Sequence, residues 1–417
     1  MHESDIIVGL DIGTTKIAAC AGRVHEGGIE VVAVRELPNS GVRKGMITDI
    51  NDTAAAISAT LEEIEHELDE PIAGVVAGVG GVEVSSSESK GVVAVARPDS
   101  EITDDDVTRA LDAAQAITLP PNREVLHSIA KYFTTDHDPA VPNPVGSKSI
   151  RLEVTSHLIT ISSLALRNLE SVVTQAGLPL TDIVFNPLAT AKAVLYKRQK
   201  ESGVMLLDIG AATTDFVIYE EGQLVQAGVI PIGSQHISND IAIGVRTNLE
   251  LAEVLKRECG TALPDQVKAS EIIRMSEFDP EDKETIKRQQ LGEIIEARLD
   301  ELFKLVNNEL KALDRNGRLP AGIVLVGNGA RLDGLVEYVK ENLKLPATLA
   351  RPLLELPTNI VDTKDIPDYT TSVGLMLWGL ENEHAIPEKR LGMPSLPQMN
   401  VDGVLNRAKD IFKQFLP

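Results

Sequence analysis

One pattern of strands and turns opens two stretches of this chain, which start about 200 residues apart. Residues 5–35 read as three short strands joined by the turns DIGTT and HEGG, and residues 203–232 repeat that order with DIGAATT and EEGQ. Glycine-containing turns between short β-branched runs are hairpin signals. A helical stretch follows each set of strands, from Asp49 and from Ser234. Because all these parts recur together, the sequence predicts two related halves rather than two unrelated hairpins.

The composition is that of a folded protein with a strongly acidic surface. Hydrophobic residues make up 43% of the chain and aromatic residues only 3%, so the core must consist mainly of Val, Ile, Leu and Ala. The formal net charge of −22 argues against a nucleic-acid partner, because binding a phosphate backbone requires a basic face. Two cysteines are too few for a disulfide framework. No apolar run approaches the ~18 residues that span a bilayer, so we expect a cytosolic protein that can still lie on a membrane.

The periodicity and composition predict an α/β protein built in several parts. In chain order, we expect the N-terminal part of the first half over 1–82, an inserted α+β subdomain over 83–162, a return to the first half over 163–202, and the second half over 203–384. Within the second half, the region around 249–315 is mostly helical and charged. Residues 385–403 contain several prolines and no hydrophobic period, which predicts a flexible linker before a last helix over 404–417.

The two Asp-Ile-Gly turns have the chemistry of a phosphate clamp. A tight turn can direct consecutive backbone N–H groups at one point, where they bind phosphate oxygens. Glycine allows close approach, threonine hydroxyls add donors, and a carboxylate can hold Mg²⁺ through water. One such turn alone is more often purely structural, but two in duplicated halves can face each other, with Asp11 and Asp208 flanking one Mg²⁺. The first turn supplies Asp11, Gly13, Thr14, Thr15 and Lys16, and the second supplies Asp208, Gly210, Thr213, Thr214 and Asp215.

A third glycine-rich turn, VGNGARLDG at residues 326–334, follows a strand and opens a helix. That context suits the sugar or base of a nucleotide, although an ordinary strand-to-helix loop is equally consistent with it. Glu253 and Lys256 lie three residues apart on one predicted helix, so both could reach a ribose or an adenine. A solvated ion pair is the alternative interpretation of these two residues.

The order of these parts resembles the actin, Hsp70 and sugar-kinase superfamily, and within it most closely the FtsA family of cell-division proteins. The strings GLDIGTTKIAA, GVRKGMITDI, NPVGSKSIRLEV and DIGAATTDFVIY stand where FtsA sequences carry similar strings, and the resemblance covers essentially the whole chain. It implies an actin-like fold of two duplicated halves around a nucleotide cleft, ATP binding and actin-like polymerisation. It also implies anchoring to the cytoplasmic side of the cell membrane at the division site, recruitment of FtsZ, and contact with other division proteins.

The resemblance also assigns residues to the site. Phosphate-one would be Gly13, Thr14, Thr15 and Lys16; phosphate-two Asp208, Gly210, Ala211, Ala212, Thr213 and Thr214; and the adenosine turn Gly327, Asn328, Gly329 and Ala330, with Glu253 and Lys256 on the purine side. FtsA sequences usually carry glycines in place of Ala211, Ala212 and Asn328. Asn tolerates left-handed geometry, whereas each Ala in a left-handed conformation would cost roughly 1–2 kcal/mol. We therefore expect the alanine pair to restrict the second turn.

Further departures bear on activity and on the alternatives. In hydrolysing relatives a Glu or Gln positions the attacking water, and Asn186 occupies that position here with a side chain one methylene shorter than that of Gln. We therefore expect slow or undetectable turnover, with ATP as a structural ligand. DIGA turns similar to this one occur in PilM, so a scaffold of type IV pilus assembly is the first alternative. A small-molecule kinase is the second, although no convincing catalytic base is evident.

The last stretch, GVLNRAKDIFKQFLP, predicts an amphipathic helix. Its apolar face comprises Val404, Leu405, Ala408, Ile411, Phe412, Phe415 and Leu416, and its other face carries Arg407, Lys409 and Lys413. A basic, amphipathic segment on an acidic protein suits an anionic membrane surface. The alternative is a helix that docks on the body of the protein or pairs with a partner.

Overall fold

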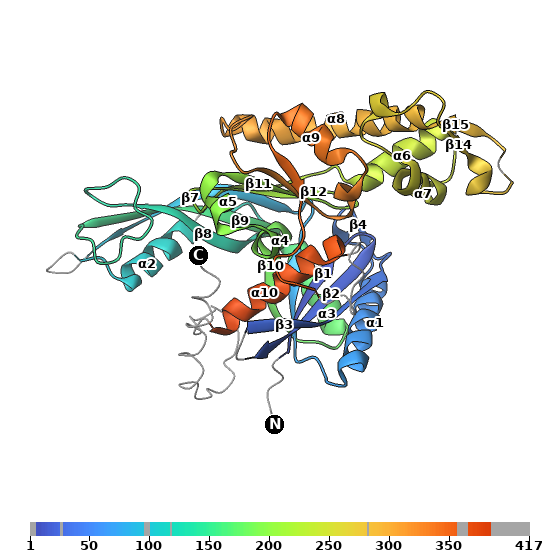
Figure 1. Cartoon of the computed structure of the whole chain (residues 1–417). Coiled ribbons are helices and arrows are strands. Elements are labelled where there is room, and N and C mark those ends of the chain that lie inside the picture. The colour runs from blue at the N-terminus through green and yellow to red at the C-terminus, as the bar shows by residue number, and fades with distance from the viewer. Residues whose placement is uncertain are drawn as a thin grey trace.

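The computed structural model describes residues 6–25, 28–95, 101–116, 119–281, 283–356 and 366–384. Two five-stranded sheets organise these residues (Figure 1). The first sheet has the order β10 (Leu180–Phe185), β6 (Val75–Val79), β1 (Ile6–Ile12), β2 (Lys16–His25) and β3 (Gly28–Pro38). The second has the order β17 (Ala347–Leu349), β16 (Gly322–Val326), β11 (Val204–Ile209), β12 (Thr214–Glu220) and β13 (Gln223–Ile230). The expected linker and C-terminal helix lie outside the described residues.

The two sheets share one topology. In each, three antiparallel strands run consecutively along the chain, a fourth strand pairs in parallel with the first of them, and a fifth pairs in parallel with the fourth. The turn after β1 and the turn after β11 therefore occupy equivalent places at the edges of their sheets. This arrangement confirms the predicted actin-like fold of two duplicated halves.

Helices cover the two sheets and bury their apolar faces. The first half carries α1 (Ile50–Leu68) and α3 (Ser163–Gln175), and the second carries α6 (Ser234–Val245), α7 (Leu249–Cys259), α8 (Arg288–Ala312) and α9 (Leu335–Leu343). Helix α1 begins at Asp49, whose carboxylate accepts a hydrogen bond from the Asp52 N–H at 2.9 Å. Its buried residues Ile57, Leu61 and Ile64 recur at helical spacing and enter the core of the first half.

A separate three-stranded sheet is inserted between β6 and α3, and Figure 1 shows it projecting away from the first sheet. It contains β7 (Val84–Ala94), β9 (Arg151–Ser162) and β8 (Arg123–Thr134), covered by α2 (Asp104–Gln115). Its first strand also contacts the second half, since the Ser86 hydroxyl donates to the Ala227 carbonyl at 2.7 Å. The shorter elements are β4 (Val42–Arg43), β5 (Met46–Ile47), α5 (Lys197–Ser202), η1 (Pro264–Gln266), β14 (Ile272–Arg274), η2 (Met275–Glu277), β15 (Thr285–Lys287), η3 (Asn328–Arg331) and η4 (Ile366–Tyr369).

Helices α4 (Asn186–Val194) and α10 (Thr370–His384) fill the junction between the halves, and Figure 1 shows α10 lying along the first sheet. Helix α10 packs backbone against backbone on both α4 and β1. A Cβ atom added to Gly374 would lie 2.1 Å from the Ala189 carbonyl oxygen, and one added to Gly9 would lie 2.2 Å from the Ser372 carbonyl oxygen. These glycines let the last described helix, which follows the second sheet in sequence, pack closely against the first half.

We predict that Gly374→Ala lowers the thermal unfolding temperature, because the new methyl group must displace the backbone of α4. Overpacking of this kind costs about 1–3 kcal/mol. Gly379→Ala is the matched control, because it brings the same gain in helix propensity. Its methyl group would meet the Cγ2 methyl groups of Ile7 and Val76, at 2.7 and 3.0 Å, and no backbone of another element, so the cost of overpacking should be smaller. Scanning calorimetry of both variants measures the difference, and equal unfolding temperatures would contradict the close contact.

Candidate functional site

The turns after β1 and β11 are closed by equivalent hydrogen bonds. In the first turn the Gly13 N–H donates to the Lys16 carbonyl at 2.9 Å, and in the second the Gly210 N–H donates to the Thr213 carbonyl at 2.9 Å. Both turns line one cavity of about 530 Å³, which lies between the two halves. A volume of this size is within the range of about 300–1,000 Å³ typical of small-molecule sites. The structure thus brings the two predicted turns to the same cleft.

Each turn is held from behind by another segment. The Asn39 side-chain amide donates to the Gly13 carbonyl at 2.8 Å and fixes the first turn. The second turn is held by the first residues of α6, where the Ser234 N–H donates to the Gly210 carbonyl at 2.9 Å and the Gln235 N–H to the Ala211 carbonyl at 2.8 Å. Asn39 was not among the predicted site residues, because nothing in its local sequence indicates this long-range contact.

The expected strain in the second turn is absent. Neither Ala211 nor Ala212 is among the described residues that have positive φ, and neither is Asn328. The cost of a left-handed alanine therefore does not apply here. Gly327, next to Asn328, has a φ of 82° instead, and a Cβ added there would lie 2.4 Å from Asp208 Oδ1. The residue that must be glycine in the third turn is thus Gly327, because the carboxylate of Asp208 fills the space beside it.

The remaining third-turn residues divide between the cleft and the interior. Asn328 lines the cleft together with Gly327. Gly329 packs against Ile209, where an added Cβ would lie 2.4 Å from the Ile209 Cγ2 atom, and Ala330 is buried in the core of the second half. Gly329 and Ala330 therefore support the turn from inside and do not line the cleft.

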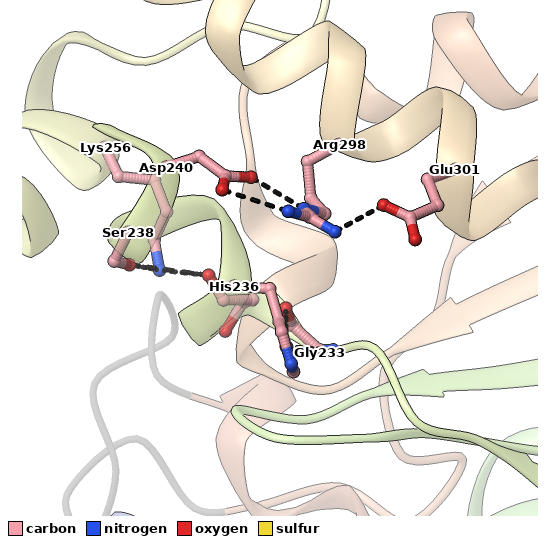
Figure 2. Close-up of polar contacts among 8 residues, drawn as sticks. Gly233, His236, Ser238, Asp240, Lys256, Arg298 and Glu301 are labelled. Atoms are coloured by element: carbon pink, nitrogen blue, oxygen red, sulfur yellow. Dashed lines mark hydrogen bonds and ion pairs between the residues drawn. The ribbon is translucent and has the colours of Figure 1, made fainter. Parts of the chain in front are cut away.

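Glu253 and Lys256 both come from α7, but only Glu253 lines the cleft. The Lys256 ammonium is buried and donates to the Ser238 hydroxyl at 2.9 Å (Figure 2). It also donates to the Ser234 carbonyl at 3.1 Å and to the Glu253 carboxylate at 2.7 Å. Lys256 thus joins α7 to the first turn of α6, the same helical turn that holds the loop after β11. Farther along α6, Asp240 pairs with Arg298 of α8 at 2.6 Å, so the helix is anchored on two sides (Figure 2).

A segment before α10 closes the cleft from the C-terminal side. Arg331 of the third turn pairs with Asp368 at 2.8 Å, and the Lys16 ammonium lies 5.9 Å from the centre of the Tyr369 ring. The Thr371 hydroxyl donates to Asp208 Oδ2 at 3.2 Å. Residues 368–371 therefore connect the first turn, the second turn and the third turn. No local signal marked these residues in the sequence, because their role arises from tertiary contacts alone.

Three carboxylates meet in this cleft, with Asp215 buried and Asp11 and Asp208 half-buried. Burial raises the pKa of Asp208 to about 7, and the neighbouring Asp215 and Asp11 carboxylates add to that shift. Burial likewise raises the pKa of Asp11 and of Asp215 to about 6, although Lys16 lowers the first and a hydrogen bond from Thr213 lowers the second. Asp215 belongs to the second turn motif but was not predicted as a ligand, and the structure places it in the lining of the cleft.

Asn186 begins α4 beside these carboxylates and lines the cleft. Its side-chain amide donates to Asp11 Oδ1 at 3.2 Å. The Oδ1 atoms of Asn186 and Asp215 are both buried without a hydrogen-bond partner among the described residues. Buried polar atoms are normally satisfied, so these two oxygens mark a place where the cleft offers acceptors to a hydrogen-bond donor or a cation.

Thirteen of the seventeen predicted nucleotide-binding residues line the cleft. The following line the cleft: Asp11, Gly13, Thr14, Thr15, Lys16, Asp208, Gly210, Ala211, Ala212, Thr213, Glu253, Gly327 and Asn328. Thr214, Lys256, Gly329 and Ala330 do not, and the Thr214 hydroxyl instead donates to the Ile232 carbonyl at 2.8 Å. Lining residues absent from the prediction include Gly45, Gly80, Gly81, Asp215, Asp368 and Thr371.

The carboxylates suit a cation only in part. No group of three or more His, Cys, Asp and Glu residues in the described parts of the chain could hold a metal ion on its own. Asp11 and Asp208 supply the hard oxygen ligands that Mg²⁺ prefers, and Mg²⁺ usually keeps several waters and shares substrate phosphates. The donor set therefore fits a Mg²⁺ that arrives with a phosphate ligand and is held partly through water.

Two sheets of one topology that face a cleft through equivalent strand turns define an actin-like protein. Solved structures of this fold agree. The chain superimposes on PilM in a PilM-PilN type IV pilus biogenesis complex with a TM-score of 0.66 and 16% identity, covering 90% of this chain and 98% of that one. It also matches MreB5 of Spiroplasma citri bound to ADP with a TM-score of 0.54 and 14% identity, covering 91% and 98%.

Sequence comparisons identify the family within this fold. A family model described as cell division protein FtsA matches residues 205–374, and one described as an SHS2 domain inserted in FtsA matches residues 81–160. FtsA of Pseudomonas aeruginosa is 36% identical over 92% of this chain and 91% of its own length. FtsA of Bacillus subtilis is 33% identical over 92% and 85%, and FtsA of Escherichia coli K12 is 31% identical over 93% and 94%. The chain belongs to the FtsA family of cell-division proteins.

We predict that Asp208→Asn stabilises the nucleotide-free protein in EDTA at pH 8, and does so less at pH 5. The pKa of Asp208 in the folded state, about 7, lies above the ordinary carboxyl pKa of 3.8, so the folded state binds the proton more tightly than the unfolded state. The destabilisation by the buried charge therefore grows as pH rises between these values, to at most about 4 kcal/mol at 1.4 kcal/mol per pKa unit.

Thermal unfolding at the two pH values measures this dependence. Glu341→Gln, on the exposed surface of α9, is the control because it removes one negative charge outside the cleft. An equal rise in the unfolding temperature of Asp208→Asn at pH 5 and at pH 8 would contradict the prediction.

Proposed function

We propose that this chain binds ATP with Mg²⁺ between its two halves, polymerises like actin on the cytoplasmic side of the cell membrane, and anchors the FtsZ ring at the division site. The observation that carries this proposal is the cleft of about 530 Å³ in which both glycine turns of the duplicated halves meet. Membership of the FtsA family supports the cell-division role, and the ADP bound to the actin-like MreB5 supports a nucleotide as the ligand.

The charges of the cleft indicate how a nucleotide would have to enter. Six carboxylates and one lysine are among the described residues that line it. A triphosphate would be repelled by such a lining unless a cation accompanied it, because like charges at short range destabilise each other. Asp11 and Asp208 would hold Mg²⁺, partly through water, and the ion would neutralise phosphate charge. The first and second turns would then supply backbone N–H donors to the phosphate oxygens.

The other parts of the chain receive their roles from the family and from the sequence. We assign 83–162 to the inserted subdomain, 249–315 to the partner-binding subdomain, 385–403 to the linker and 404–417 to the membrane-targeting helix. Supporting the last assignment, the sequence of that helix is basic and amphipathic on a chain of net charge −22. No helix in the described parts of the chain has both the length and the apolar character needed to cross a membrane.

We predict that Gly327→Ala weakens ATP binding tenfold or more. The added methyl group would lie 2.4 Å from the Asp208 carboxylate and 2.7 Å from the Ile209 carbonyl, so the wall of the cleft must move. Gly317→Ala is the matched control, because its φ of 67° carries a similar left-handed cost while nothing lies within 4 Å of the added Cβ. Titration with a fluorescent ATP analogue and Mg²⁺ measures both, and wild-type affinity of Gly327→Ala would contradict the assignment of the cleft.

We predict that the full-length protein sediments with anionic vesicles and carries FtsZ with it, whereas a chain ending at Pro397 leaves both in the supernatant. The reason is that the truncation removes the only segment for which we propose a membrane role. Neutral phosphatidylcholine vesicles serve as the control for electrostatic attraction. Equal sedimentation of the two chains would exclude the C-terminal helix as the anchor. Binding to a pilus peptide instead of FtsZ would favour the pilus alternative, and substrate-dependent ADP formation would favour a kinase.

A further inference from the structure

A small hairpin, β4 and β5, lies beside the first turn and has no role in the function proposed above. Arg43 pairs with Met46 across it, so its loop has two residues, Lys44 and Gly45. Their φ values are 53° and 74°. A two-residue hairpin with positive φ at both positions is favoured by Asn-Gly or Asp-Gly, because Lys in the left-handed region costs roughly 1–2 kcal/mol. Strain of this kind beside a cleft motivates a search for a role of the Lys44 side chain.

The tip of this hairpin contacts the first turn directly and the second half of the protein through Gly81. The Gly45 N–H donates to the Thr14 hydroxyl of the first turn at 3.3 Å. Gly45 also packs against Gly81, so closely that a Cβ added to Gly45 would lie 2.8 Å from the Gly81 Cα. The Gly81 N–H in turn donates to Asp215 Oδ2 of the second half at 3.3 Å. Lys44 is therefore the sequence neighbour of Gly45, which contacts the first turn and lines the cleft.

Among the described residues, no lysine or arginine free of a salt bridge lines this end of the cleft. Lys16 is the lysine among its described lining residues, and its ammonium is paired with Glu36. Lys44 is exposed and forms no ion pair with the described residues. A phosphate oxygen in the cleft would therefore find in Lys44 a cation whose binding breaks no existing salt bridge. Charge-assisted hydrogen bonds of this kind are shorter and stronger than neutral ones.

The base of the hairpin is fixed, while its tip has space behind it. At the base, the Thr48 N–H donates to the Gly41 carbonyl at 2.8 Å. Behind the hairpin lies a second cavity of about 190 Å³, lined by residues that include Gly45, Met46, Ile47, Ala165 and Asn168. Across this cavity the Asn168 amide reaches the Ile47 carbonyl at 3.4 Å. Close-packed interiors resist displacement, so a tip backed by a cavity can shift where a packed one cannot.

We propose that the Lys44–Gly45 turn is a flap that recognises the terminal phosphate of a bound nucleoside triphosphate. The Lys44 ammonium donates to an oxygen of that phosphate, and the contact is lost with a diphosphate, which ends one phosphate earlier. The flap would thus distinguish ATP from ADP at the first turn, and its movement would change the shape of the second cavity. This inference rests on the proposed function, because it requires a nucleotide in the cleft.

The test compares ATP and ADP affinities of Lys44→Asn with those of the wild-type full-length protein, in Mg²⁺ and by calorimetric titration. Asn accepts the left-handed conformation and lacks the ammonium, so the hairpin is retained and only the cation is removed. We expect ATP affinity to fall tenfold or more, while ADP affinity changes less than twofold. Arg43→Gln is the matched control, because it removes one positive charge from the adjacent exposed residue. Lys44→Arg keeps the charge and should preserve most of the preference for ATP.

Three results would overturn the flap. They are an unchanged ATP affinity of Lys44→Asn, an equal loss of ATP and ADP affinity, and the same selective loss in Arg43→Gln, which would indicate only a general electrostatic effect. An unfolding temperature of Lys44→Asn equal to or above that of the wild type shows that the fold is intact. Wild-type protein that binds neither nucleotide would refute the proposed function together with the flap. Wild-type binding of both nucleotides with no effect of Lys44→Asn would refute the flap alone.

Discussion

The shape of the cleft depends on holding three carboxylates close together, one buried and two half-buried, where the two halves meet. Burial of Asp11, Asp208 and Asp215 raises the pKa of each, so the protein holds these groups against a desolvation cost. The surrounding residues follow from that constraint. A Cβ on Gly80 would lie 2.4 Å from Asp215 Oδ2, and one on Gly327 would lie equally close to Asp208 Oδ1. Glycine is needed at these positions because the acidic side chains already occupy the space that a side chain would fill.

The same carboxylates connect the cleft to the packing between the halves. Asn186 at the start of α4 donates to Asp11, and Thr371 at the start of α10 donates to Asp208. The two helices are joined to each other where the hydroxyls of Thr190 and Thr371 lie 3.0 Å apart. Since Gly374 packs its backbone against α4, a displacement of either carboxylate acts on a rigid pair of helices. The charge at the bottom of the cleft and the relative placement of the halves are therefore coupled by direct contacts.

The sequence was informative where the signal was local. The Asp-Ile-Gly turns combine a strand, a glycine and small hydroxyl residues within a few positions, and in the structure both turns line one cleft. The pattern that joined Glu253 to Lys256 was also local, but it could not reveal that the ammonium is buried against Ser234 and Ser238 and does not line the cleft. Asp368 and Thr371 were not predicted, because they reach the site from a segment that is distant in the sequence. The strain expected at Ala211 is absent because its backbone angles depend on the packing of α6 behind the turn, which the local sequence does not show.

Net charge adds a constraint on how such a protein can lie on a membrane. A chain of formal charge −22 is repelled by an anionic lipid surface, although the proposed anchor carries Arg407, Lys409 and Lys413. The two tendencies are compatible if attraction and repulsion act at different distances. Electrostatic forces between exposed charges fall off over about 8 Å at physiological salt. A random-coil chain with as many residues as the linker proposed over 385–403 would span about 25 Å on average. The basic helix can then bind headgroups while the acidic body stays beyond the range of their repulsion. On this argument the linker matters for its length more than for its sequence, because a much shorter one would bring the acidic body within the range of the anionic surface.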